Sequence, residues 1–393
     1  MMKAINKSLL LSSFPDWMIS FLLPIYCTGL GFSPAQTTRM FALHSLFLLL
    51  GKLVSGRLCD RVGRRKVFAA GLVLMSGAYL LLAFAQGAAL LYSSQMLDGA
   101  ASALLAVSAY AMLADRSGEN MAVDRGRQSA ASNRGALYGV FLYFMLLSWL
   151  GFGEGWKAFF LLCALLTLLG AGNNYRDLPA DQGTAAPFAA QKPNWRALLA
   201  SRVGGLLAVR TLMALALNML GAVFVLVMMG RFGEDMMLIG VTCLIPSCLL
   251  TWLMPKIGAQ VKQIGEKKAF LCCGVLALIF LAFLANSRQP VSFALGWAGY
   301  QVAVTGLCLS IDAVFSFSIT EKQEDSASPL VGQLSGLYSC SINLGGTISS
   351  LFSGFLLERC GDLMPFLVTA VLLVLTVLAF WMAAGRQTAV NKG

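Results

Sequence analysis

Four charged residues lie deep inside long apolar runs of this 393-residue sequence, namely Asp16, Asp98, Asp312 and Arg210. A charge inside a bilayer is costly unless it lines a cavity or meets a partner, so each is a candidate functional group. Loss of water favours the protonated form of a carboxyl group, which allows a buried aspartate to exchange a proton near neutral pH. We therefore expect Asp16 and Asp98 to be proton-coupling residues. Asp312 is a third candidate, which either pairs with Arg210 or binds a substrate.

His44 is the single histidine of the chain and falls near the start of the apolar run 40–57. An unperturbed imidazole titrates near pH 6.5, so His44 is a further candidate for moving protons. The alternative is a hydrogen-bonded histidine at the membrane interface. Arg210 likewise has two interpretations, because its side chain either binds an anion or extends to the cytoplasmic surface.

Uncharged polar residues within the apolar runs could complete a substrate site. Together with Arg210, the candidates for lining such a cavity are Gln95, Asn218, Gln301, Thr305, Asn343 and Tyr300. This mixture of amide, hydroxyl and aromatic groups favours an amphipathic or weakly cationic organic solute.

The composition explains where these residues must lie. Apolar residues make up 58% of the chain and charged residues only 12%, with a mean hydropathy of +0.74. A soluble domain carries about 25% charged residues, so the composition excludes a soluble enzyme, a disordered protein and a secreted disulfide scaffold. A multi-pass all-α membrane protein remains. A bilayer needs about 20 apolar residues per helix, which predicts twelve transmembrane helices near 8–30, 40–57, 67–87, 89–114, 135–153, 157–174, 203–230, 236–255, 269–286, 291–319, 331–357 and 361–384.

The basic residues predict the orientation of these helices. The chain has 29 Lys and Arg residues against 18 Asp and Glu residues. Most of the cations fall on one side if both termini are cytoplasmic, as the positive-inside rule requires. The excess of cations therefore indicates membrane orientation and not a nucleic-acid partner. The N-terminal apolar run has no short cleavable pattern and is expected to remain as the first helix.

The chain contains an internal repeat with a spacing of 202 residues. The segment Gly56–Lys66 aligns with Gly258–Lys268, with both glycines and the last two cations retained, and Asp16 aligns with Asn218. The longest polar stretch between the two copies holds three prolines. We therefore predict a six-helix half at 1–174, a cytoplasmic linker at 175–202 and a second six-helix half at 203–393.

The segment Gly56–Lys66, a G-x-x-x-D-R-x-G-R-R-K pattern between the second and third helices, resembles the signature motif of the major facilitator superfamily. Gly155-Trp156-Lys157 and the glycine-rich stretch 332–346 resemble two further landmarks of that family. Two six-helix halves in parallel repeat agree with its fold. The drug-antiporter pattern of the fifth helix is missing, since residues 135–153 hold no proline, and Gln95 replaces the arginine expected in the fourth.

The resemblance implies a gate at the cytoplasmic surface. Asp60 would cap the N-terminus of the eleventh helix in the outward-open state, where the helix dipole favours an anion, and Arg61 would pair with Asp115. The glycines would allow close helix approach and a tight turn. Arg64 and Arg65 either join this gate or anchor the chain on anionic lipid. The gating residues are therefore Gly56, Asp60, Arg61, Gly63, Arg64, Arg65 and Asp115.

The sequence thus predicts a secondary active transporter in the cell (cytoplasmic or inner) membrane. It would move a small organic solute by alternating access, with proton-coupled efflux as the favoured mode, as a monomer in the lipid bilayer. Alternatives are an uptake symporter or uniporter for an organic anion, a non-transporting sensor and a lipid flippase. No motif for an enzyme, a nucleotide, a cofactor or a metal is recognisable.

Overall fold

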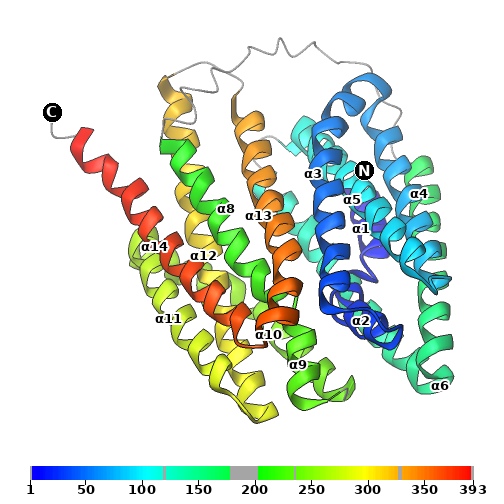
Figure 1. The fold of residues 1–393 in the computed structure, drawn as a ribbon. Helices are drawn as coiled ribbons and strands as arrows, with labels where there is room; N and C mark the ends of the chain where they lie inside the picture. The colour runs from blue at the N-terminus through cyan, green and yellow to red at the C-terminus, as the bar shows by residue number, and fades with distance from the viewer. Residues whose placement is uncertain (1, 118–120, 178–201, 234–235, 326–329, 391–393) are drawn as a thin grey trace. The chain divides into compact units, whose positions relative to one another are not determined.

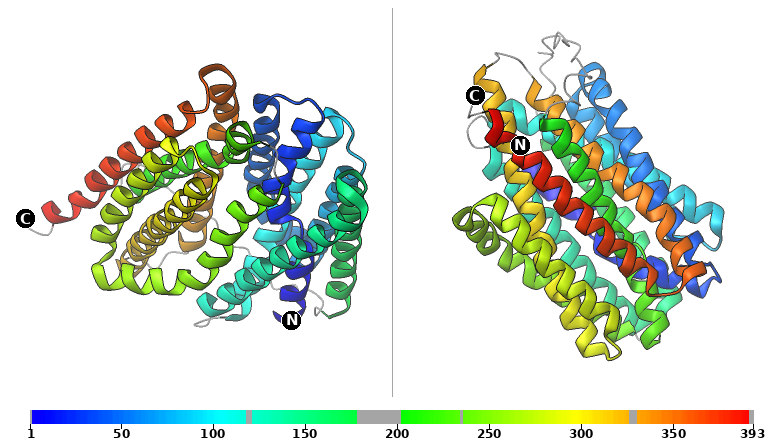
Figure 2. Two further views of the ribbon diagram at one scale, coloured as in Figure 1. Left: turned by 90° about the horizontal axis from the view of Figure 1, so that it is seen from below. Right: turned by 60° about the vertical axis from the view of Figure 1, so that its left-hand side comes forward.

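The computed structural model describes residues 2–117, 121–177, 202–233, 236–325 and 330–390, and every regular element in these ranges is a helix (Figure 1). The chain divides into two compact units, Met1–Phe32 with Arg39–Ala189 and Ser33–Thr38 with Ala190–Gly393. Both views of Figure 2 show the helices of each unit running side by side. The helices are α1 (Met2–Ser12), α2 (Asp16–Gly29), α3 (Pro34–Val62), α4 (Arg64–Ala83), α5 (Ala88–Ser117), α6 (Met121–Asp177), α8 (Arg202–Gly221), α9 (Phe224–Phe232), α10 (Met236–Ile264), α11 (Glu266–Asn286), α12 (Pro290–Asp325), α13 (Leu330–Cys360) and α14 (Met364–Val390).

The all-helical membrane fold is confirmed. Within the described ranges, nine helical stretches are long and apolar enough to cross a bilayer. One of them, Ala130–Arg176, contains both the fifth and the sixth predicted span, and Gly151 interrupts its helical geometry with φ 74°. The number of twelve spans, the cytoplasmic position of both termini and the division into two halves stay predictions.

Two predicted spans are each divided into two helices. The run 8–30 consists of α1 and α2, separated at Ser13–Pro15, and the run 203–230 consists of α8 and α9, separated at Ala222 and Val223. Pro15 explains the first break, because proline has no backbone N–H and disfavours helical geometry in the residue before it. The described residues between the fourth and fifth predicted spans, 89–114 and 135–153, are helical as well, since α5 continues to Ser117 and α6 begins at Met121.

Close helix contacts bring the first unit together. Helix α4 packs against α5 and α6, and α1 packs against α6. A Cβ atom at Gly135 or Gly139 would collide with the carbonyl oxygen of Leu10 or Phe14 in the α1 region. The glycine-rich fifth span therefore has glycines because its backbone lies directly against the backbone of the first.

The internal repeat is visible in the backbone at two pairs of glycines. Gly63 precedes α4 with φ 100° and ψ 143°, and Gly265 precedes α11 with φ 89° and ψ 135°. Gly31 and Gly233 form a second pair, with φ 80° and 86°. Both pairs are separated by the spacing of the sequence repeat, and an L-residue rarely adopts these values. The two copies thus make the same turns although most of their side chains differ.

Two aromatic side chains donate hydrogen bonds to the carbonyl groups at the C-terminal end of α4. In the first unit, Trp156 Nε1 donates to the Leu82 carbonyl at 3.0 Å, and Tyr26 Oη donates to the Ala85 carbonyl at 2.6 Å. The two rings stack with centroids 4.1 Å apart. The G-W landmark of the sequence therefore fixes the end of α4 to the entry of the sixth span.

Replacing Trp156 with phenylalanine is expected to destabilise the protein by about 1–2 kcal/mol, because the change removes one buried hydrogen bond and part of a buried ring. Trp156 is 1% exposed. Trp149→Phe is the matched control, since that side chain is 80% exposed. Thermal unfolding in detergent, followed by circular dichroism, would compare them. Equal melting temperatures for the two variants would contradict the anchoring role.

Candidate functional site

The first polar cluster joins α3 and α5. His44 Nδ1 lies 3.1 Å from Asp98 Oδ2, an ion-pair distance when the imidazole is protonated. Asp98 is only 7% exposed. The next residue, Gly99, makes this approach possible, because a Cβ atom there would collide with the carbonyl oxygen of His44. The sole histidine and a buried aspartate, far apart in sequence, therefore form a pair at a tight helix crossing.

Asp16 stands beside this pair at the start of α2. It occupies the first turn after the break at Pro15, where the helix dipole favours a negative charge. The Ser13 hydroxyl donates a hydrogen bond to its carboxyl group, and Asp98 and His44 both act on it electrostatically. The break in the first span thus places a carboxyl group at a helix N-terminus inside the first unit.

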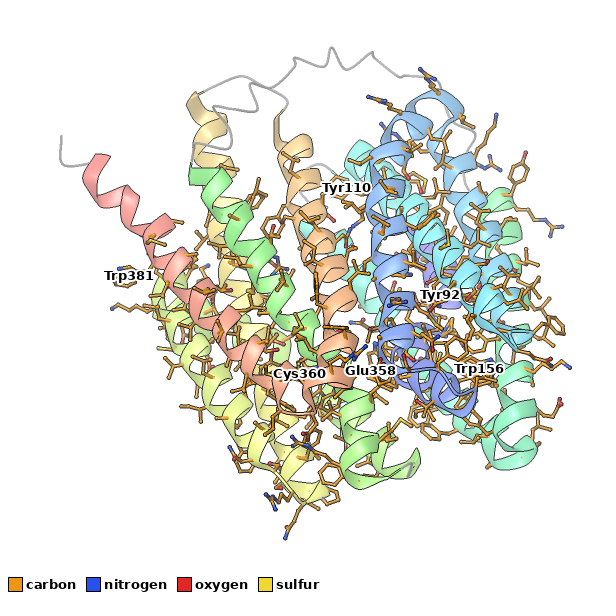
Figure 3. All side chains as sticks on the ribbon, in the orientation of Figure 1. Tyr92, Tyr110, Trp156, Glu358, Cys360 and Trp381 are labelled. Atoms are coloured by element: carbon orange, nitrogen blue, oxygen red, sulfur yellow. The ribbon has the colours of Figure 1, made fainter. Side chains whose placement is uncertain are left out.

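A cavity of about 410 Å³ lies in the first unit and is open to Asp16. Helices α1, α2, α4, α5 and α6 contribute to its wall, which includes Tyr110, labelled in Figure 3. The polar lining residues are Ser12, Ser13, Asp16, Ser102, Tyr110, Gln128, Ser132 and Asn133. Leu9, Met75 and Leu105 are among the apolar ones. The cavity therefore offers both hydrogen-bonding groups and an apolar surface.

The second polar cluster lies in the second unit. Arg210 Nη2 is 3.6 Å from Asp312 Oδ1, and Arg210 Nη1 is 3.6 Å from Cys308 Sγ. Tyr338 donates a hydrogen bond to Asp312, and its ring lies 5.3 Å from the guanidinium carbon. Phe315 stacks on Tyr338 with centroids 4.1 Å apart. Of the alternatives left open by the sequence, the structure places Arg210 and Asp312 together as a pair.

The remaining cavity candidates are dispersed. Gln95 is buried in α5, one turn before Asp98, and Asn218 is exposed on α8, where its amide donates to the Ala214 carbonyl at 2.8 Å. Thr305 donates to the Gln301 carbonyl at 2.8 Å. Tyr300 Oη and Asn343 Nδ2 are buried without a hydrogen-bond partner among the described atoms. Only Gln95 of this set lies next to the first cluster.

The gating motif is described in part. Gly63 makes the expected tight turn, and Arg64 Nη1 donates to the Ala111 carbonyl at 3.0 Å. The guanidinium of Arg65 lies 4.5 Å from the centre of the Tyr175 ring, and Arg61 is exposed. The expected close approach at Gly56 is not seen among the described atoms, since a Cβ there would meet none within 4 Å. The side chains of Asp60 and Asp115 lie outside the described residues.

Sequence reasoning missed three polar residues of these clusters: Ser13, Gln128 and Cys308. A neutral serine, glutamine or cysteine carries no intrinsic functional signal, and Gln128 lies between the fourth and fifth predicted spans. Its only signal was helical spacing, which places Ser132 one turn further along α6. Among the described residues, no group of three His, Cys, Asp or Glu side chains could hold a metal ion.

The sequence matches the family model of the Major Facilitator Superfamily over residues 8–320. The chain belongs to the major facilitator superfamily. It is therefore a multi-pass membrane protein of a transporter family, as the Gly56–Lys66 motif implied. No curated protein matches the sequence significantly.

Solved structures of other superfamily members share the fold. A mutant of the nucleoside transporter NupG is 14% identical with a TM-score of 0.75, covering 97% of this chain and 98% of that one. A bacterial homologue of the human lysosomal transporter Spinster, inward-facing and occupied, is also 14% identical with a TM-score of 0.75, at 98% and 96% coverage. A structure of proton-dependent oligopeptide transporters is 12% identical with a TM-score of 0.73, at 100% and 99% coverage. At these identities the likeness shows the fold alone.

Proposed function

We propose that this protein is a proton-coupled secondary active transporter that exports a small organic solute by alternating access. The observation that carries the proposal is the His44–Asp98 pair, 3.1 Å apart, with Asp16 beside it at the cavity. An imidazole–carboxylate pair changes its net charge when it gains or loses one proton. Because a net charge is costly inside a membrane, protonation of this cluster can bias one transporter conformation over another.

The rival proposal, uptake of an organic anion held by Arg210, has less support. The guanidinium of Arg210 faces the Asp312 carboxylate at 3.6 Å, which offsets its attraction for a second anion. The two resident charges also interact with Tyr338 and Cys308. We propose that this cluster holds α8, α12 and α13 together, with Asp312 as a static partner of Arg210 and not as a proton carrier.

Asp98→Asn is expected to abolish solute movement driven by a pH gradient, because an amide cannot take up the proton that the carboxylate exchanges. Exchange of labelled for unlabelled solute without a gradient should persist. The assay is a screen of radiolabelled amines, sugars, nucleosides and carboxylates in proteoliposomes, followed by variant analysis with the solute that is moved. Glu154→Gln is the matched control, since Glu154 is an exposed acid on α6.

Gradient-driven movement that survives Asp98→Asn at the wild-type rate would refute the coupling assignment. Movement of the solute in the same direction as the protons would indicate that the protein is a symporter and not an exporter. Binding without exchange would indicate a sensor, and a screen with no response under either gradient direction would contradict proton-coupled solute transport altogether.

A further inference from the structure

The described wall of the cavity in the first unit carries a negative charge and no positive one. Among the described residues that line it, Asp16 is the only charged one. The Asp16 side chain is exposed to the cavity, while the nearby Asp98 carboxylate faces His44. A solute in this space therefore meets one carboxyl group with no fixed cation in the described wall, which favours a positively charged group over a negative one.

Another part of the cavity wall holds a hydrogen-bond donor that has no acceptor among the described atoms. Gln128 is 9% exposed, lines the cavity, and its Nε2 atom has no hydrogen-bond partner among the described atoms. A buried amide donor without a partner costs free energy, and a ligand acceptor at this point would remove that cost. The nearby Ser132 and Asn133 side chains line the cavity too. This part of the wall is suited to a hydroxyl or carbonyl oxygen.

The apolar part of the wall determines the size and the apolar character of the ligand that the cavity can hold. Leu9 of α1, Met75 of α4 and Leu105 of α5 line the cavity between the polar groups. A volume of about 410 Å³ is in the range of small-molecule sites. An aliphatic or aromatic body of modest size would cover these side chains while its polar ends reach Asp16 and Gln128.

We propose that this cavity binds a small amphipathic organic cation, with its ammonium group on Asp16 and a hydroxyl or carbonyl group on the Gln128 amide. The proposal rests on the proposed transport function and names its substrate class. It also assigns Gln128 a role in substrate selection. The described residues that form this site all belong to the first unit.

Three probes of one shape test the charge preference. Tyramine, tyrosol and p-hydroxyphenylacetate share a phenol ring and end in an ammonium, a hydroxyl and a carboxylate group. Equilibrium dialysis with radiolabelled probes and the full chain in detergent, at about pH 8, keeps the amine protonated and free carboxyl groups ionised. We expect tyramine to bind most tightly and p-hydroxyphenylacetate most weakly.

Two variants separate the two contacts. Asp16→Asn should weaken tyramine binding about tenfold, the equivalent of one charge-assisted hydrogen bond, and leave tyrosol almost unaffected. Gln128→Leu should weaken all three probes similarly and keep their order, because the amide carries no charge. Glu154→Gln should change nothing, and melting temperatures check that each variant is folded.

Equal binding of the three probes, preference for p-hydroxyphenylacetate, no tyramine binding, or an undiminished tyramine preference in Asp16→Asn would each overturn the inference. Its failure is distinguishable from that of the proposed function. If Asp98→Asn abolishes gradient-driven movement but the probes bind alike, only the substrate class is wrong. If tyramine is preferred but Asp98→Asn remains coupled, only the coupling assignment is wrong.

Discussion

Replacing Gly99 with alanine is expected to destabilise the first unit by about 2–3 kcal/mol and to disable proton coupling with it. The added Cβ would lie 3.1 Å from both the carbonyl carbon of His44 and the amide nitrogen of Leu48, and closer still to the His44 carbonyl oxygen. These are backbone atoms, so relief requires α3 and α5 to separate. Overpacking of this kind costs about 1–3 kcal/mol, and the upper part of the range applies because no flexible side chain can move aside.

The separation would also lengthen the 3.1 Å contact between His44 and Asp98. Gly172→Ala is the matched control, because a Cβ at that helical position on α6 meets no atom within 4 Å. We expect a lower melting temperature and loss of gradient-driven transport for Gly99→Ala, and neither for Gly172→Ala. A Gly99→Ala variant with wild-type stability and coupling would show that the crossing is not as tight as described.

Replacing Arg231 with methionine is expected to cost about 3 kcal/mol of stability in the second unit. Arg231 Nε lies 2.7 Å from Asp362 Oδ2, and Nη1 donates to the Leu284 and Ser287 carbonyls at 3.1 and 3.3 Å. These carbonyls end α11, where a positive charge is favoured by the helix dipole. The corresponding carbonyls of the first unit, at Leu82 and Ala85, receive Trp156 and Tyr26 instead.

The large effect expected for Arg231→Met follows from the burial of the arginine side chain. The Arg231 side chain is 13% exposed, whereas that of Asp362 is 49% exposed. Loss of the arginine therefore leaves helix-end carbonyls without their donor, while loss of the acid leaves a donor that keeps two acceptors. Asp362→Asn should cost only about 1 kcal/mol. Arg288→Met, at an exposed position, serves as the control in the same thermal unfolding experiment. Equal effects of Arg231→Met and Arg288→Met would refute the capping role.

The fold class was predictable because the membrane constrains it so strongly. A bilayer excludes unsatisfied backbone groups, so long apolar runs must become helices. The Gly56–Lys66 motif was enough to indicate the superfamily. The breaks between α1 and α2 and between α8 and α9 were not predicted, because each falls inside a continuous apolar run. The helical nature of residues 121–134 was missed for the opposite reason, because a polar stretch between spans is usually a loop.

The candidate site was predictable only as a set of charges. Asp16, Asp98, Asp312 and Arg210 stand out because any charge in an apolar run is expensive. Their grouping could not be read from the sequence. His44 had no visible partner, and Asp312 was equally compatible with proton transfer, substrate binding and pairing. Gln128 is chemically ordinary, and only its unsatisfied amide at a cavity distinguishes it.

The sequence by itself determined that this chain is an all-helical membrane protein of the major facilitator superfamily, and which few residues carry charge among the apolar ones. Composition and local motifs suffice for that, because transfer from water to lipid depends on residue type and run length. The tertiary structure alone decided that His44 meets Asp98, that Arg210 meets Asp312, and that Asp16 opens on a cavity with Gln128. Those pairings depend on which helices approach closely, and glycines such as Gly99 set that distance through backbone contacts with residues remote in the chain.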